Sequence, residues 1–163
     1  EAHTPGTEAA DNGTVRLDQD NEPQPDVLLR IIDDRGGQSS TSRDDYVEGA
    51  PDLICEVASS SASYDLHAKL HAYRRNGVRE YLVVRTLDRA VDWFVLREGR
   101  FDRLEPGSDG LLRSMVFPGL WLDPAALLAG NIKLLLDVLA RGLASEPHRL
   151  FVQELEDRVV PPG

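Results

Sequence analysis

Three residues in the first half of the chain are of the types that support metal-dependent chemistry: Asp26, Glu56 and Lys69. Asp26 opens one apolar run, and Glu56 is the only ionisable residue inside the next one, residues 53–58. If the two runs form neighbouring strands, both carboxylates can point to one face, where they can share a proton or hold a hard cation such as magnesium. A lysine beside them would neutralise developing negative charge or orient an attacking water.

Each of these residues also has a purely structural interpretation. Asp26 can cap the start of a strand, Lys69 can be solvated, and Glu56 can be paired with a buried arginine. A carboxylate that is buried without a partner costs several kcal/mol, so the partner of Glu56 separates the two interpretations. The residues alone leave both open.

The strands that would position the carboxylates follow from hydrophobic patterning. Residues 27–32 and 53–58 are short runs of apolar, mostly branched residues, which predict strands, and the second run is apolar on both faces apart from its glutamate. Short turns separate the later apolar runs, which predict an antiparallel meander over residues 80–84, 90–96, 101–105 and 111–116.

The lysine falls in a segment with helical spacing. Residues 65–76 place Leu66, Leu70 and Tyr73 on one apolar stripe of the kind that packs on a sheet. Lys69 flanks this stripe, and its long side chain can therefore reach over the sheet.

The order of elements indicates an α/β fold around one mixed sheet. Residues 1–24 are polar and are predicted to be a flexible arm, in which residues 15–17 can form a short edge strand. Residues 25–128 form the predicted α/β core, and residues 129–163 the C-terminal helices and tail. These last helices can pack on their own sheet or form a homodimer interface.

The composition limits the class of protein. The net charge of −10 argues against broad, sequence-independent binding to nucleic acid, although it leaves room for a local basic cleft or for binding assisted by a divalent cation. No signal peptide or membrane-length apolar run is visible, and the single cysteine, Cys55, is expected to be buried. We therefore expect a cytoplasmic protein without a membrane partner, and the first residue, Glu1, suggests a fragment or a processed chain.

Other residue patterns have simpler interpretations. His67 and His71 have a spacing that can bind zinc, but no third ligand is evident, so a basic helix face is favoured. His67, Arg74 and Arg75 can contact phosphates or simply be solvated. Trp93 and Trp121 are expected to fill the core.

Several motifs also occur in a characteristic order: Pro25-Asp26, Glu56-Val57-Ala58-Ser59, Tyr64-Asp65-Leu66 with Lys69 and Tyr73, Gly77-Val78-Arg79-Glu80-Tyr81, Leu112-Arg113-Ser114, Phe117-Pro118-Gly119-Leu120-Trp121-Leu122-Asp123, and Gly142-Leu143-Ala144-Ser145-Glu146 followed by Phe151. As a set, over about residues 15–156, they resemble the Uma-two family of putative restriction endonucleases.

The resemblance implies the PD-(D/E)XK nuclease fold, a restriction-endonuclease-like mixed sheet flanked by helices, here with a C-terminal helical extension. In that superfamily an aspartate and a glutamate bind magnesium, and a lysine positions or activates the water that hydrolyses a phosphodiester bond. Carried over, Asp26 and Glu56 are metal ligands, and the backbone carbonyl of Val57 is a further ligand. The usual lysine position, two after the glutamate, is Ala58 here, so Lys69 on the helix is the candidate for that role.

Two features depart from the family pattern. The family usually has a helix and strands before residue 15, where this chain shows only a polar arm, so we expect those elements to be missing. Asp52 also follows a proline, but it lies only four residues before Glu56 on the same strand and is the weaker choice for the first acid.

The leading hypothesis is a magnesium-dependent endonuclease that acts on DNA, with Asp26 and Glu56 holding the metal and Lys69 assisting the water. The alternative is a catalytically inactive nuclease-fold domain with a binding or scaffold role. A third hypothesis, a hydrolase for a small phosphorylated substrate, would account better for the negative charge.

Overall fold

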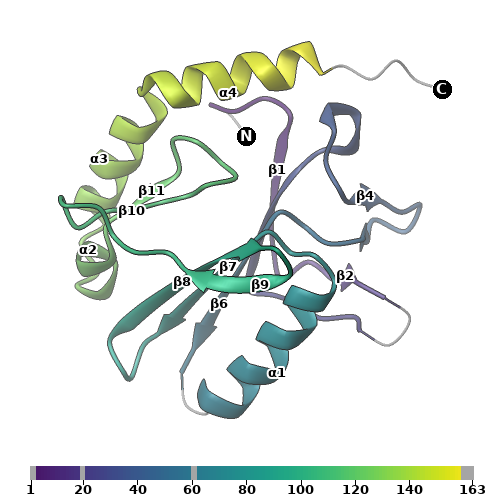
Figure 1. Ribbon diagram of the computed structural model, residues 1–163, viewed down its shortest axis with the longest axis horizontal. Helices are drawn as coiled ribbons and strands as arrows, with labels where there is room; N and C mark the ends of the chain where they lie inside the picture. Colours follow the sequence, from purple (N-terminus) through teal and green to yellow (C-terminus); the bar gives the residue numbers. More distant parts are fainter. Residues whose placement is uncertain (1–2, 19–20, 60–61, 159–163) are drawn as a thin grey trace.

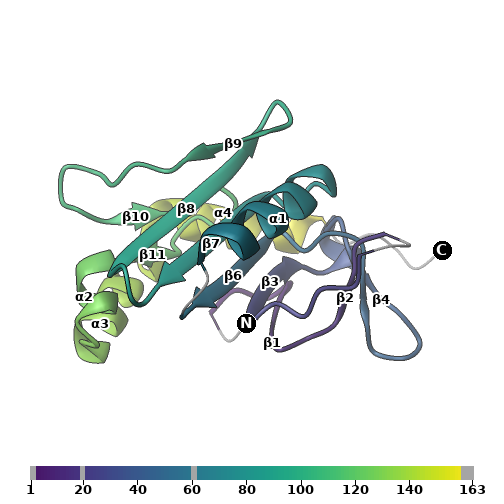
Figure 2. The same ribbon diagram turned by 90° about the horizontal axis from the view of Figure 1, so that it is seen from below.

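The computed structural model describes residues 3–18, 21–59 and 62–158, and the side chains of residues 62–66 lie outside that description. It confirms the predicted α/β architecture, in which a mixed sheet is flanked by helices (Figure 1). The two principal flanking helices are on opposite sides of the sheet: α1 (Ala62–Arg75) covers one face and α4 (Glu146–Asp157) the other (Figure 2).

The main sheet has the strand order β1-β3-β6-β7-β8-β9. Neighbouring strands are antiparallel except for β6 and β7, which run parallel because α1 carries the chain across between them. The strands of this sheet are β1 (Thr7–Asp11), β3 (Val27–Ile31), β6 (Leu53–Ala58), β7 (Glu80–Arg85), β8 (Ala90–Arg97) and β9 (Arg100–Arg103).

Strand β6 lies inside the sheet because it is apolar on both faces. Ile54 packs toward α1, whereas Leu53 and Cys55 pack on the opposite side. Since side chains alternate along a strand, Glu56 lies on the α1 face with Ile54. The antiparallel pairing of β3 with β6 sets Val27 opposite Cys55, so the start of β3 lies beside the end of β6.

The face beneath α1 has its own hydrophobic cluster, formed by Ala50, Ile54, Tyr73, Val78, Tyr81 and Val83. Leu70 and Tyr73 pack there as the helical spacing predicts, while the side chain of Leu66 lies outside the described residues. The rings of Tyr73 and Tyr81 meet edge to face, with centroids 5.0 Å apart. Gly77 follows the helix at a φ of +84°, a left-handed conformation that glycine adopts without strain.

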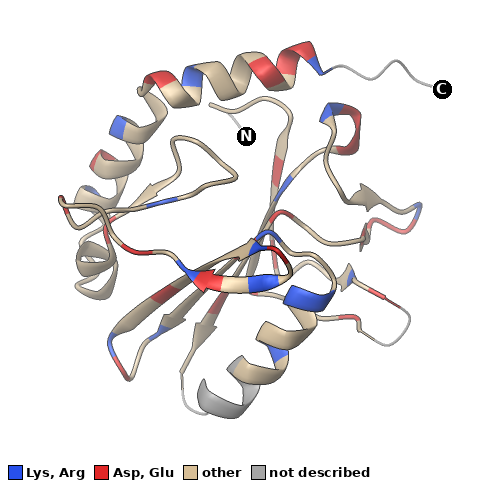
Figure 3. Ribbon diagram, in the orientation of Figure 1, with Lys and Arg blue, Asp and Glu red and all other residues tan. Residues whose placement is uncertain are grey.

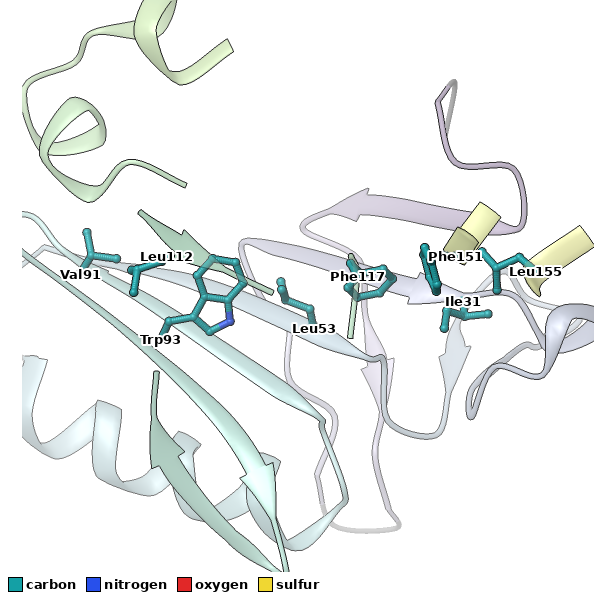
Figure 4. Close-up of a cluster of buried hydrophobic side chains, with 8 residues drawn as sticks. All are labelled: Ile31, Leu53, Val91, Trp93, Leu112, Phe117, Phe151 and Leu155. Carbon is teal, nitrogen blue, oxygen red and sulfur yellow. The ribbon is translucent and has the colours of Figure 1, made fainter. Parts of the chain in front are cut away.

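The opposite face packs against the C-terminal half of the chain. Its core is a row of side chains between the sheet and α4, namely Ile31, Leu53, Val91, Trp93, Leu112, Phe117, Phe151 and Leu155 (Figure 4). The elements that contribute to or surround this core are β10 (Leu112–Arg113), β11 (Trp121–Leu122), α2 (Pro124–Leu128), α3 (Ile132–Leu143) and α4.

A buried carboxylate fastens the segment around Ser114 to the sheet. Glu80, which is fully buried, accepts hydrogen bonds from Ser114 Oγ at 2.7 Å and from Trp93 Nε1 at 3.2 Å. The backbone N–H groups of Met115 and Val116 donate to its other oxygen, at 2.6 and 3.2 Å. Burial raises the pKa of Glu80 although all four donors favour the charged form.

The prediction of a flexible arm over residues 1–24 is wrong for Thr7–Asp11, which is β1 and pairs with β3 along its whole length. The ion pair between Glu8 of β1 and the buried Arg30 of β3 holds this edge strand. The polar segment between β3 and β6 contributes β4 (Ser40–Thr41) and β5 (Val47–Glu48) to a small sheet with β2 (Val15–Arg16).

The two tryptophans differ from each other. Trp93 fills the core as predicted and is 1% exposed. Trp121, in β11, is only half-buried, and the guanidinium of Arg113 lies over its ring, 4.5 Å from the centroid. The prediction of a core position is therefore wrong for Trp121.

The C-terminal helices pack on the sheet through α4, while Ile132 and Leu136 of α3 are 62% and 60% exposed. A dimer interface on α3 stays a prediction. In the described ranges, no helix combines the length and the apolar character that crossing a membrane requires.

Candidate active site

The two carboxylates predicted from the sequence lie at one end of adjacent strands. Continuing the β3–β6 register one step beyond Val27 and Cys55 sets Asp26 opposite Glu56. Oδ2 of Asp26 accepts a hydrogen bond from the backbone N–H of Val57 at 2.7 Å. Within the described part of the chain its other oxygen, Oδ1, has no hydrogen-bond partner. Asp26 therefore joins the start of β3 to the end of β6 and keeps one oxygen for a further interaction.

The partner of Glu56 is a lysine and a tyrosine rather than an arginine. Its side chain is only 7% exposed, and Lys69 Nζ lies 2.9 Å from Oε2. The hydroxyl of Tyr73 donates to Oε1 at 2.7 Å. Each carboxylate oxygen thus has its own donor, and one of the two donors carries a positive charge.

Helix α1 supplies both donors because Lys69 and Tyr73 are four residues apart and therefore share one helix face. That face lies over the end of β6. Tyr73 is fully buried, whereas the side chain of Lys69 is 34% exposed. The two residues also line an open cavity of about 300 Å³, whose lining includes residues 21–23.

The charges of Asp26 and Glu56 affect two neighbouring groups, the phenol of Tyr73 and the thiol of Cys55. The pKa of Tyr73 is raised, chiefly by burial and next by the charge of Glu56, with a smaller effect from Asp26. Burial also raises the pKa of Cys55 to about 12, with Asp26 and Glu56 adding to the shift. Tyr73 is therefore a neutral hydrogen-bond donor at any pH at which the protein works, and Cys55 stays a thiol.

The backbone carbonyl of Val57 points toward the β3 side. The neighbouring carbonyl, that of Ala58, accepts from the N–H of Thr86 at 3.1 Å on the β7 side, and successive carbonyls of a strand face opposite edges. On the β3 side the register continues to Pro25, which has no N–H to donate. The Pro-Asp motif therefore leaves the carbonyl of Val57 without the ladder bond that another residue would supply.

These groups form an oxygen-only donor set, which is the set that magnesium and calcium prefer. In residues 3–18, 21–59 and 62–158 there is no group of three or more His, Cys, Asp and Glu side chains that could hold a metal ion. With Asp26, Glu56 and the backbone carbonyl of Val57 as protein ligands, a cation would need water to complete its coordination. Magnesium is commonly bound through one or two carboxylates with several waters retained, so the residues present fit this ion.

Other candidates from the sequence have structural roles or lie apart from the site. Asp52 is fully buried, accepts from the N–H of Ile31 at 2.8 Å and forms an ion pair with Arg79 at 2.9 Å, although the geometry at Oδ1 is not that of a hydrogen bond. Its contacts thus fasten β6 to β3. His67 and His71 are exposed on α1 and belong to no metal-binding cluster among the described residues.

Charges near the site are largely paired. Arg85, which lies opposite Ala58 in the β6–β7 register, forms ion pairs with Asp88 and Asp92, and Arg103 also pairs with Asp92. Figure 3 shows basic and acidic segments interspersed along β8, β9 and the helices. Arg85 and Arg103 are thus paired with acidic side chains, and the net charge of the chain is −10.

Three of the four side chains described here are ones that the sequence singles out as candidates. Asp26 and Glu56 lie on adjacent strands, and Lys69 reaches Glu56, as the spacing allowed. The role of Tyr73 was missed, because its place in an apolar stripe predicted a core residue. The one signal that could have revealed it is its position four residues after Lys69, on the same helix face.

Comparisons with known proteins identify the fold and the family of the chain. A crystal structure of a putative nuclease belonging to DUF820 from Anabaena variabilis ATCC 29413 has the same fold, with a TM-score of 0.55 and 16% identity over 76% of this chain and 69% of that one. No curated protein matches the chain. The family model of Uma2, described as putative restriction endonuclease, matches residues 1–125, and the chain therefore belongs to the Uma2 family.

Proposed function

We propose that the chain is a magnesium-dependent endonuclease that hydrolyses phosphodiester bonds in DNA. One observation carries the proposal: Asp26 and Glu56 lie at the same end of adjacent strands, and Lys69 reaches Glu56 from α1 at 2.9 Å. The description of the Uma2 family as restriction endonucleases supports the reaction class, as does the description of the Anabaena protein as a nuclease.

Each residue would have a distinct role. Asp26, Glu56 and the backbone carbonyl of Val57 would hold the ion. Magnesium, when bound, supplies Lewis-acid stabilisation of the charge that develops on the phosphate. Lys69 would orient the attacking water and offset charge on the phosphate, since its side chain is 34% exposed and the residue lines the cavity of about 300 Å³.

The proposal is tested with plasmid DNA. Wild-type protein incubated with magnesium should nick or linearise the plasmid, and EDTA should abolish the reaction. Asp26→Asn and Glu56→Gln should reduce cleavage to the level seen with EDTA. Asp137→Asn, on the exposed face of α3, is the matched control and should cleave like wild type. Cleavage that survives both site substitutions would contradict the assignment.

A second candidate function is a binding or scaffold domain that keeps the nuclease fold without catalysis. It is favoured by Ala58, which stands where the superfamily carries its lysine, and by the net charge of −10. It predicts that neither magnesium nor manganese binds in a calorimetric titration and that plasmid remains intact. Heat of metal binding that is seen with wild type and disappears in Glu56→Gln would favour the metal-dependent endonuclease over the scaffold domain.

A further inference from the structure

We infer that Tyr73 is a positioning residue of the proposed metal site: its hydroxyl holds the Glu56 carboxylate in place for a cation, while the contact with Lys69 is exchangeable. The inference rests on the proposed function. It gives Tyr73 and Lys69 different roles toward Glu56: Tyr73 holds the carboxylate, and Lys69 can leave it.

The two donors to Glu56 differ in burial. Tyr73 is 0% exposed and its hydroxyl is enclosed with the carboxylate, whereas the side chain of Lys69 is 34% exposed. A buried hydrogen bond to an ionised acceptor is short and strong, as the 2.7 Å separation of the Tyr73 hydroxyl from Oε1 indicates. The long, partly exposed side chain of Lys69 has room to move beside the cavity, whereas the ring of Tyr73 is held edge to face against Tyr81.

The two donors also differ in charge. A metal cation at Glu56 and the Lys69 ammonium repel each other and compete for the same carboxylate. The phenol is an uncharged O–H donor, so its hydrogen bond to Oε1 does not repel a cation. Tyr73 can therefore keep its bond to Oε1 when a cation approaches.

The two donors also orient the Glu56 carboxylate. With one donor on Oε1 and another on Oε2, the carboxylate plane is fixed from two points of one helix face. If Lys69 moves away, the Tyr73 hydroxyl is the described contact that still prevents the carboxylate from turning. Supporting hydrogen bonds of this kind typically change metal affinity by about 10- to 100-fold when they are removed.

The test is a calorimetric titration of magnesium and of manganese into wild-type protein, Tyr73→Phe and Lys69→Met. Tyr73→Phe keeps the ring and removes the hydroxyl, and we expect its metal affinity to fall by about 10- to 100-fold. Lys69→Met removes the competing cation, and we expect an affinity equal to or higher than that of wild type. Tyr46→Phe is the control, since the Tyr46 ring lies under the guanidinium of Arg16, in another part of the fold.

Two readouts separate positioning from a purely structural role. The thermal midpoint of Tyr73→Phe in EDTA shows whether the protein is folded, and plasmid cleavage by this variant should recover as the metal concentration is raised. Unchanged metal affinity in Tyr73→Phe, with wild type binding normally, would overturn the inference alone. A cleavage defect that no metal concentration restores would also overturn it. Absence of metal binding in the wild type would overturn the proposed function as well.

Discussion

Lys69 of α1 and Glu56 of β6 form an ion pair across the interface between helix and sheet, with 2.9 Å between Nζ and Oε2. The pair joins the side chain of Glu56, which is 7% exposed, to that of Lys69, which is 34% exposed. A buried charge of this kind depends on its partners much more than an exposed one does. Its removal therefore affects stability as well as any chemistry at the site.

Replacing Lys69 by Met should lower the free energy of unfolding by about 1–3 kcal/mol, because Glu56 stays buried and, among the described residues, keeps only the Tyr73 hydroxyl as a donor. Urea denaturation measures the change. Lys133→Met is the matched control, since the Lys133–Asp137 pair is 89% and 62% exposed and should contribute no more than about 0.5 kcal/mol. Equal losses of stability in Lys69→Met and Lys133→Met would show that the buried pair contributes no more than an exposed one.

Two substitutions of Asp26 separate its bond to the backbone from its charge. Asp26→Asn keeps an oxygen that can accept from the N–H of Val57, so it should fold with nearly wild-type stability but lose affinity for magnesium. Asp26→Ala removes both, and should in addition lose about 1 kcal/mol of stability. Calorimetry and urea denaturation on the same samples provide both quantities. Full metal affinity in Asp26→Asn would exclude Asp26 as a charged ligand.

Much of this site follows from local patterns in the sequence. The run of residues 53–58 predicted β6 because an apolar segment of that length must be covered on both faces. Lys69 was placed near the site because helical spacing sets it beside an apolar stripe. These inferences need only residues that are close together in the chain.

What could not be predicted depends on contacts between distant segments. The partner of β1 is β3, and the polar Thr7–Asp11 forms an edge strand through its pairing with β3, to which the Arg30–Glu8 ion pair adds. Apolar spacing cannot distinguish a tyrosine packed among hydrocarbons from one that donates to a buried carboxylate. The hydrogen bond from Tyr73 to Glu56 follows only from how α1 lies on β6.

Gly142→Ala tests the close packing of α3 on the turn before β11. A Cβ at Gly142 would lie 2.1 Å from the carbonyl oxygen of Gly119, so the helix would have to move. We expect a loss of about 1–3 kcal/mol from this overpacking, although alanine is by itself the better helix former. The control is Ala140→Gly, at an exposed position of α3, which should cost about 1 kcal/mol through helix propensity alone. A stabilised Gly142→Ala protein would contradict the close contact.

The buried Glu80 should give stability a pH dependence that its replacement removes. Burial raises the pKa of Glu80 above its ordinary value of 4.5, so the folded state holds this proton more tightly than the unfolded chain. The contribution of Glu80 to stability is then largest below pH 4.5, decreases as the pH rises to the folded-state pKa, and is constant above it. Urea denaturation of wild type and Glu80→Gln over a pH series gives this contribution as a difference between the two proteins. A difference that instead rose with pH would mean that the four hydrogen bonds to the carboxylate outweigh its desolvation.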